Sequence, residues 1–348
     1  MDGDVKKGHT AEDTGDGTYT PRDHVGSGVS MVGSVHAVVI RDTRLHWEER
    51  DTPVPGDTEL LVAVHAAGLN GADMMQRLGR YPAPPGAPAD IPGMELAGEV
   101  VAVGSRVSRF APGDRVMGLV GGGAQATMAV IEEAHALAVP DSIPWAEAGG
   151  FPEVFSTAFD ALFTHAELSM GERVLVSGGA GGVGTAGVQL AAAAGASVVA
   201  TVRDPARREE VALLGASAVV DPDDVAAHGP YDVVLELVGA ASLPSVLPHL
   251  ATGARVVVIG VGSGAKVEIN LLALMGARAR IGGATLRGRS RREKANVATA
   301  VATHVLPLLS SGRIRVPICA TFQLPDAGAA YERFTAGGKL GKVVLVKP

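Results

Sequence analysis

Short apolar runs separated by Gly, Pro and Asp turns fill the region between His36 and Val139. They read HAVVIR, ELLVAVHAA, ELAGEVVAVG, DRVMGLV and ATMAV. Runs of this length, bounded by turn residues, predict short strands, and a series of them favours a small irregular β-barrel. We assign this domain to residues 31–153.

From Trp145 the pattern changes to helical spacing, in the stretch WAEAGGFPEVFSTAFDALFTHAEL. Strand-like and helix-like segments then alternate, with the strands RVLVS, SVVATV, SAVVD, YDVVLELVG and RVVVIGVG. This alternation predicts a doubly wound (Rossmann) parallel sheet with right-handed crossovers, over residues 154–286. Residues 287–348 contain a helix-like stretch and a final strand, KVVLV, which we expect to return to the barrel.

Residues 1–30 carry six acidic and three basic side chains without apolar periodicity, which predicts a flexible polar tail. Met31 begins a segment typical of a domain start, so a translation-start artefact is an alternative origin for this tail.

Composition narrows the function classes. A length of 348 residues with 47% hydrophobic and 19% charged residues predicts a globular protein of two domains. The net charge of −7 argues against nucleic acid as a partner. The single cysteine, Cys319, excludes an intrachain disulfide and fits a reducing cytoplasm. No run approaches the roughly 18 apolar residues of a membrane span, so we expect a cytoplasmic protein without membrane contact.

A glycine-rich turn follows the strand RVLVS. Gly179, Gly181 and Gly184 have G-x-G-x-x-G spacing, and a helix that includes Gly182 and Val183 follows. This order of strand, turn and helix predicts a dinucleotide-binding turn, whose amides face a pyrophosphate. The alternative is a tight strand-to-helix turn that binds no ligand.

The second strand of this unit bears on the cofactor. NAD-binding proteins place a carboxylate at its tip, where this chain has Val202. Arg203 and Arg207 follow and could contact a 2′-phosphate, which favours NADPH. Asp204 argues against this, and solvated charge at a helix start is the alternative explanation of the two arginines.

The histidines do not form a metal-ligand pattern. The chain has ten, without a pair such as H-x₃-H, and one cysteine near the C-terminus, so we expect no metal. G-x-S-x-G is absent, which argues against a hydrolase. Hydride-transfer enzymes of this architecture can use zinc to polarise the substrate carbonyl, and this sequence lacks the ligands for it. The substrate that accepts the hydride would then have to do so readily by itself, as a quinone or an alkene conjugated to a carbonyl does.

Several motifs together resemble the medium-chain dehydrogenase/reductase superfamily, and within it the zinc-independent quinone oxidoreductases of the tumour-suppressor-inducible type. They are AGLNGADMMQRLGRYP at 67–82, PPG at 84–86, IPGMELAGEV at 91–100, PE at 152–153, AGGVGT at 180–185 and TLRGR at 285–289. The resemblance implies a GroES-like catalytic domain. Zinc-containing relatives carry cysteine and histidine where this chain has Asn70 and Met94.

The resemblance also implies roles for individual residues. It places Asn70, Asp73 and Tyr81 in the active cleft, and Thr157 near the nicotinamide amide. Arg207 falls where several relatives have a lysine for the 2′-phosphate. The remaining implied cofactor contacts are Gly260, Val261, Leu286 and Arg287.

Three of these assignments have alternatives. Tyr81 is the candidate hydrogen-bond donor or proton source for the acceptor carbonyl, but it could only pack there. Asn70 could be a buried amide that binds backbone groups. The run of arginines at 287, 289, 291 and 292 could bind nucleic acid, but a solvated helix start with one phosphate contact is the simpler interpretation.

Three functions remain open at this point. The first is an NADPH-dependent quinone reductase, the second an enoyl reductase of a biosynthetic pathway, and the third a non-catalytic NADPH-binding protein.

Residues 265–284 end in the apolar ARIGGAT, which predicts an edge strand of the nucleotide-domain sheet. Members of the resembled family commonly join two such edges, so the resemblance implies a homodimer of this kind.

Overall fold

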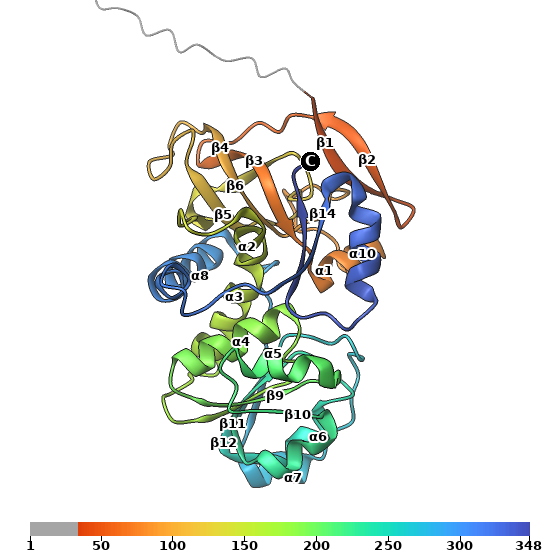
Figure 1. Cartoon of the computed structure of the whole chain (residues 1–348), viewed down its shortest axis with the longest axis vertical. Helices are drawn as coiled ribbons and strands as arrows, with labels where there is room; N and C mark the ends of the chain where they lie inside the picture. The colour runs from red at the N-terminus through yellow and green to blue at the C-terminus, as the bar shows by residue number, and fades with distance from the viewer. Residues whose placement is uncertain (1–33) are drawn as a thin grey trace, which may run out of the picture. The chain divides into compact units, whose positions relative to one another are not determined.

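The computed structural model describes residues 34–348, so the predicted tail at 1–30 lies outside the described residues. In this part the chain forms a mixed seven-stranded sheet, a parallel six-stranded sheet and a separate hairpin (Figure 1). The strands of the first half are β1 (Ser34–Arg41), β2 (Arg44–Asp51), β3 (Glu59–Gly68), β4 (Glu95–Val103), β5 (Arg115–Leu119), β6 (Met128–Glu132) and β7 (Ala136–Ala138).

The five apolar runs predicted as strands correspond to β1, β3, β4, β5 and β6. The sequence pattern missed β2, RLHWEERD, because its residues are mostly polar; it pairs antiparallel with β1 along its whole length. The mixed sheet has the order β14-β15-β3-β4-β5-β7, and β6 also pairs with β3.

The last two strands of the chain join this first sheet. They are β14 (Ile318–Gln323) and β15 (Lys342–Val346), and β15 pairs antiparallel with β3, Val344 opposite Gly68. This pairing brings Lys342 close to the segment that follows β3, which matters for the site described below.

The second sheet is entirely parallel, with the order β10-β9-β8-β11-β12-β13. This order is that of a doubly wound dinucleotide-binding sheet, in which ligands bind beyond the carboxyl ends of the two central strands. Its strands are β8 (Arg173–Val176), β9 (Ser197–Thr201), β10 (Ala218–Val220), β11 (Tyr231–Glu236), β12 (Leu250–Val258) and β13 (Arg280–Gly283).

The helices are short, apart from α4 and α8. They are α1 (Gly71–Arg77), α2 (Trp145–Gly150), α3 (Pro152–Phe159), α4 (Gly182–Ala193), α5 (Arg208–Ala212), α6 (Leu243–Val246), α7 (Leu271–Ala277), α8 (Arg291–His304), α9 (Leu306–Ser310) and α10 (Ala327–Thr335). Short 3₁₀ segments are η1 (Glu133–His135), η3 (Pro205–Arg207), η4 (Pro222–His228), η5 (Leu247–His249) and η6 (Leu324–Asp326), and η2 (Asp160–His165) is a π-helical turn.

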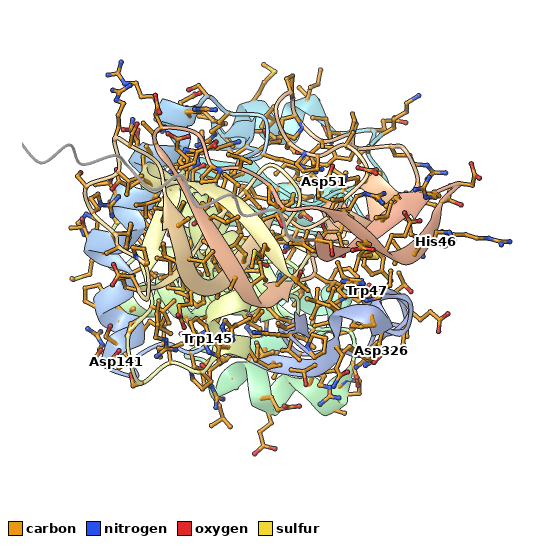
Figure 2. The ribbon with its side chains drawn as sticks, turned by 90° about the horizontal axis from the view of Figure 1, so that it is seen from above. His46, Trp47, Asp51, Asp141, Trp145 and Asp326 are labelled. Carbon is orange, nitrogen blue, oxygen red and sulfur yellow. The ribbon has the colours of Figure 1, made fainter. Side chains whose placement is uncertain are left out.

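The helical stretch predicted from Trp145 is divided in the structure into α2, α3 and the wide turn η2. Proline lacks a backbone N–H and is tolerated only in the first turn of a helix, so Pro152 begins a new one. Trp145, labelled in Figure 2, starts α2 and stacks on His65 of β3 with 4.5 Å between ring centroids.

The helix α3 joins the two sheets through their core. Its Val154 and Phe155 belong to one apolar cluster with Met117 of β5 and Val176 of β8. Side chains from the first turn of α3 are thus held in place by both sheets, and this turn carries part of the candidate site.

Candidate active site

The glycine-rich turn lies directly after β8, at the carboxyl edge of the parallel sheet. The Gly179 N–H donates to the Thr201 carbonyl of β9 at 2.9 Å, and a Cβ added at Gly179 would lie 2.8 Å from the Ala200 Cβ. At Gly184 an added Cβ would lie 2.3 Å from the Gly178 oxygen. Packing of the strand against the helix therefore requires glycine at both positions.

Gly181 differs from these two glycines. An added Cβ there would meet only the Gly178 oxygen, at an ordinary 3.5 Å, so the fold does not require glycine at this position. Gly181 is the N-cap of α4, and Gly182 and Val183 begin its first turn. The first amides of a helix have no intrahelical acceptor, so open space beside them suits an anionic group. The turn therefore fits a pyrophosphate.

The end of β9 carries the residues expected to select the cofactor. Val202 is buried and Arg203 is exposed. Arg207, in η3, forms an ion pair with Glu210 at 2.7 Å, and Asp204 accepts a hydrogen bond from the Ala206 N–H. Exposed ion pairs contribute little stability, so Arg207 can exchange this partner for a phosphate at small cost.

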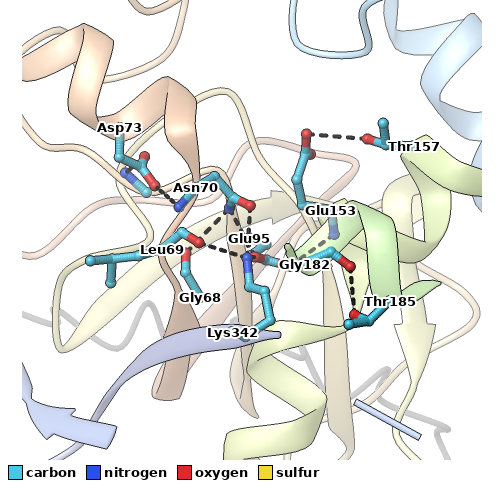
Figure 3. Close-up of polar contacts among 11 residues, drawn as sticks. Gly68, Leu69, Asn70, Asp73, Glu95, Glu153, Thr157, Gly182, Thr185 and Lys342 are labelled. Carbon is cyan, nitrogen blue, oxygen red and sulfur yellow. Dashed lines mark hydrogen bonds and ion pairs between the residues drawn. The ribbon is translucent and has the colours of Figure 1, made fainter. Parts of the chain in front are cut away.

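A buried polar cluster surrounds the Lys342 ammonium (Figure 3). Its Nζ donates to Glu95 Oε1 at 2.6 Å, to Asn70 Oδ1 at 2.7 Å and to the Leu69 carbonyl at 2.7 Å. The Asn70 amide also donates to Glu95 Oε1 at 2.8 Å. An ammonium has three N–H donors, so all those of Lys342 are used inside this cluster.

Asp73 is fully buried and serves the backbone. Its carboxylate accepts the Asn70 N–H at 2.8 Å and the Gly93 N–H at 3.1 Å. Burial raises its pKa to about 6 against the lowering effect of these bonds. Asp73 thus holds the start of α1 and the segment before Glu95 together, and its side chain does not reach open space.

Glu153 and Thr157 lie one turn apart on α3. The Glu153 N–H donates to Glu95 Oε2 at 2.8 Å, while its side chain extends away from Lys342 and accepts a bond from the Thr157 hydroxyl at 3.3 Å (Figure 3). Burial and the nearby Glu95 charge raise the pKa of Glu153 to about 7, and Lys342 opposes the shift.

Tyr81 is half-buried, and the Arg287 guanidinium lies over its ring at 5.3 Å from the centroid. Within residues 34–348 its hydroxyl has no hydrogen-bond partner, which leaves it available to an acceptor. Burial raises its pKa above the ordinary value.

Arg287, an expected cofactor contact, is held by other parts of the protein. Arg287 is buried and donates to the carbonyls of Gly121 and Tyr81 and to the Gln76 side chain. Arg289 pairs with Asp160 and Arg291 with Glu132, so the run of arginines is not a free basic surface. Arg287 instead joins α1 to the two loops that contain Tyr81 and Gly121.

The other expected cofactor contacts lie beyond the ends of β12 and β13. The Gly260 N–H donates to the Glu236 carbonyl, and an added Cβ at Gly260 would lie 2.3 Å from the Leu237 oxygen. Val261 is half-exposed, whereas Leu286 is buried in the core shared by the two sheets. Gly260 and Val261 follow β12 at the same edge as the glycine turn.

Sequence reasoning missed three residues of the cluster, namely Glu95, Glu153 and Lys342. Each stands in an otherwise apolar run, GMELAG, GFPEVF and GKVVLV. A charge in such a run is buried with its neighbours and needs a partner, which is the signal that could have identified them.

A cavity of about 680 Å³ is lined in part by Gly121, whose carbonyl accepts a hydrogen bond from Arg287. Its walls include the loop Pro84–Pro88, the segment Leu119–Gly123 and Lys294 of α8.

In the described part of the chain, no three His, Cys, Asp or Glu side chains gather as a metal site requires. None of the helices in residues 34–348 is long and apolar enough to cross a membrane.

Two segments of the chain, one in each sheet, match known protein families. Residues 56–141 match the alcohol dehydrogenase GroES-like domain and residues 182–302 the zinc-binding dehydrogenase family. The quinone oxidoreductase of Homo sapiens is 30% identical over 307 residues, 84% of this chain and 91% of that protein.

Two further similarities bear on function and fold. Polyketide synthase GfsB of Streptomyces halstedii is 37% identical over 227 residues, 63% of this chain and 4% of that protein. The solved structure of an alcohol dehydrogenase superfamily protein from Novosphingobium aromaticivorans superposes with a TM-score of 0.81 at 29% identity, covering 90% of this chain and 100% of that one.

The expected fold class, a GroES-like domain with a Rossmann sheet, is therefore confirmed. The chain is an oxidoreductase that belongs to the quinone oxidoreductase branch of the medium-chain dehydrogenase/reductase superfamily.

Proposed function

We propose that this protein transfers hydride from NADPH to a quinone or a similarly conjugated carbonyl compound without zinc. The observation that carries the proposal is the Lys342 ammonium, bound to Asn70 and Glu95. Asn70 and Met94 stand where the resemblance expects zinc ligands, and a cation already neutralises Glu95 beside them. The donor set does not fit zinc, and an acceptor that needs no Lewis acid suits such a site.

Metal removal tests this proposal. Exhaustive chelation is expected to leave quinone turnover and the unfolding midpoint unchanged, because neither depends on a metal. Inactivation that added zinc reverses would contradict it.

The cofactor proposal rests on the glycine turn and on the end of β9. When bound, the reduced nicotinamide supplies the hydride. The amides beside Gly181 would hold the pyrophosphate, while Arg203 and Arg207 would meet the 2′-phosphate, because buried Val202 offers no carboxylate to a ribose hydroxyl. Replacing both arginines by alanine should weaken NADPH binding at least tenfold and change NADH binding little, because charge-assisted contacts contribute about 1.5–3 kcal/mol. Equal losses for both cofactors would refute the preference for NADPH.

We place the ring of the acceptor near Tyr81. The rest of the acceptor molecule would occupy the cavity beside the Pro84–Pro88 loop. The likeness to a polyketide synthase favours a second candidate, an enoyl reductase that acts on an activated alkene. Initial rates of NADPH oxidation with a set of quinones and enones separate the two. Binding of NADPH without oxidation by any acceptor would leave a non-catalytic role.

The proposed homodimer rests on one edge of the parallel sheet. β13 is its last strand, and on the adjoining α7 the side chains of Leu271, Leu272 and Met275 are 63–76% exposed. An open strand edge beside exposed apolar side chains suits pairing with a second copy. Light scattering at micromolar concentration should give the mass of a dimer.

A further inference from the structure

Glu153 differs from its polar neighbours in access to solvent. Asn70, Asp73, Glu95, Thr157 and Lys342 are all at most 8% exposed, whereas Glu153 keeps partial exposure. Its backbone is fixed, because its N–H is bound to Glu95 and its helix is packed between the two sheets. Glu153 is therefore a carboxyl on a rigid element that reaches open space from a buried cluster.

The cluster leaves Glu153 without a cation partner. The three donors of Lys342 go to Glu95, Asn70 and the Leu69 carbonyl, so none remains for Glu153. Its Oε1 accepts the long bond from Thr157, and its Oε2 has no partner within residues 34–348. A carboxyl so poorly paired favours its neutral, protonated form, which makes it a proton donor.

The charges that shift the pKa of Glu153 come from three elements. Glu95 of β4 and Asp73 of α1 raise its pKa, and Lys342 of β15 lowers it. In turn, the Glu153 charge contributes to the raised pKa of Tyr81, and it opposes the lowering of the pKa of Arg287 and Lys294 that burial causes. Glu153 thus lies close enough to both the Lys342 cluster and Tyr81, where the acceptor is proposed to bind, for their charges to interact.

We propose that Glu153 donates the proton that neutralises the acceptor oxygen after hydride transfer. Hydride brings an electron pair to the conjugated acceptor and leaves negative charge on its oxygen. The O–H bond of Glu153 then breaks, its electron pair stays on the carboxylate, and a new O–H bond forms on the product. Water reprotonates the carboxylate. Tyr81 would orient the acceptor, because its raised pKa makes it the weaker acid. This inference rests on the proposed reductase function.

The first test compares Glu153→Gln with Glu147→Gln, a control for a partly exposed carboxyl on the preceding α2. Glu153→Gln should lower kcat with a quinone about 100-fold, the usual scale of general acid catalysis, and leave the dissociation constant for NADPH within twofold. The wild-type kcat should fall as pH rises through about 7, and the variant should lose this step. Full kcat with an unchanged pH profile in Glu153→Gln would overturn the inference.

The second test needs neither cofactor nor acceptor. Infrared difference spectra of the protein alone, recorded between pH 5.5 and 8.5, should show a protonated carboxyl that titrates near 7 in the wild type and in Glu147→Gln, in addition to the Asp73 carboxyl near 6 that all variants share. Persistence of the carboxyl that titrates near 7 in Glu153→Gln would overturn the assignment. If Glu153→Gln does not fold, Glu153→Asp replaces it, and unchanged kcat and pH profile would count against the inference. A wild type that reduces no acceptor would instead refute the proposed function, while the infrared result would still stand or fall separately.

Discussion

The glycine turn and the Lys342 cluster meet at Gly182, yet they are built in opposite ways. Residues 178–184 of the turn are consecutive, whereas Lys342 contacts Leu69 across 273 positions of the sequence. An added Cβ at Gly182 would lie 2.9 Å from Lys342 Cδ, so the two regions pack against each other. The turn is specified by local backbone geometry, and the cluster by the return of β15 to β3. A local motif can therefore be found whole in the sequence. The members of a cluster assembled by topology can be noticed there only one by one, as charges in apolar runs, and the sequence does not show that they meet.

The largest effect is expected for Lys342→Met. The change leaves the Glu95 carboxylate buried without its cation, which costs about 3–5 kcal/mol of unfolding free energy. Urea unfolding measures it. Adding Glu95→Gln in the same chain should recover part of the loss, because no buried charge then remains unpaired. A loss below about 1 kcal/mol for the single variant would contradict the structural role of the cluster.

A pair of alanine substitutions separates packing from ligand binding in the turn. Gly184→Ala should lower the free energy of unfolding by about 1–3 kcal/mol, because the added Cβ would overlap the Gly178 carbonyl oxygen. Gly181→Ala should change stability by less than about 0.5 kcal/mol and still weaken NADPH binding at least tenfold, because the new methyl group takes the space of the pyrophosphate. Calorimetry of unfolding and of binding gives both values. Unchanged NADPH binding in Gly181→Ala would mean that the turn has a structural role alone.

Elements that depend on neighbouring residues could be predicted from the sequence, whereas tertiary contacts could not. The apolar runs predicted most strands, and G-x-G-x-x-G marked the turn, because both depend on neighbouring residues. β2 was missed for its polar composition, and the predicted helix from Trp145 is interrupted at Pro152. Arg287 resembled a surface cation in the sequence, but tertiary contacts with Gly121 and Tyr81 bury it. Lys342 and Glu153 acquire their setting from segments far away in the chain, which no local pattern records.

The raised pKa of Glu153 predicts a pH effect on stability. Its ordinary value is 4.5 and its folded value about 7, so the folded protein binds this proton more tightly than the unfolded chain does. The stabilisation is full below about 4.5 and is lost as pH rises through 7. Between pH 6 and 8 the free energy of unfolding of the wild type should fall by roughly 1–1.5 kcal/mol more than that of Glu153→Gln, as measured by urea unfolding. Parallel curves for the two proteins would contradict the shift.

The smallest effect on the site is expected from a change at the sheet edge. The Ala284 N–H donates to the Val258 carbonyl of β12, so strand alternation turns the Ile281 N–H toward the open edge. Ile281→Pro should shift the proposed dimer toward monomer in light scattering and leave NADPH affinity within twofold. Gly282→Pro, whose lost N–H faces β12, should also lower the unfolding midpoint. A dimer unaffected by Ile281→Pro would locate the interface elsewhere.

The most direct test of the whole account is the initial rate of NADPH oxidation by chelator-treated enzyme with a series of quinones and enones. The account predicts turnover without added metal, fastest with a quinone or a closely related conjugated carbonyl compound, and slower with NADH than with NADPH. No oxidation with any acceptor, or activity that returns only with zinc, would contradict it.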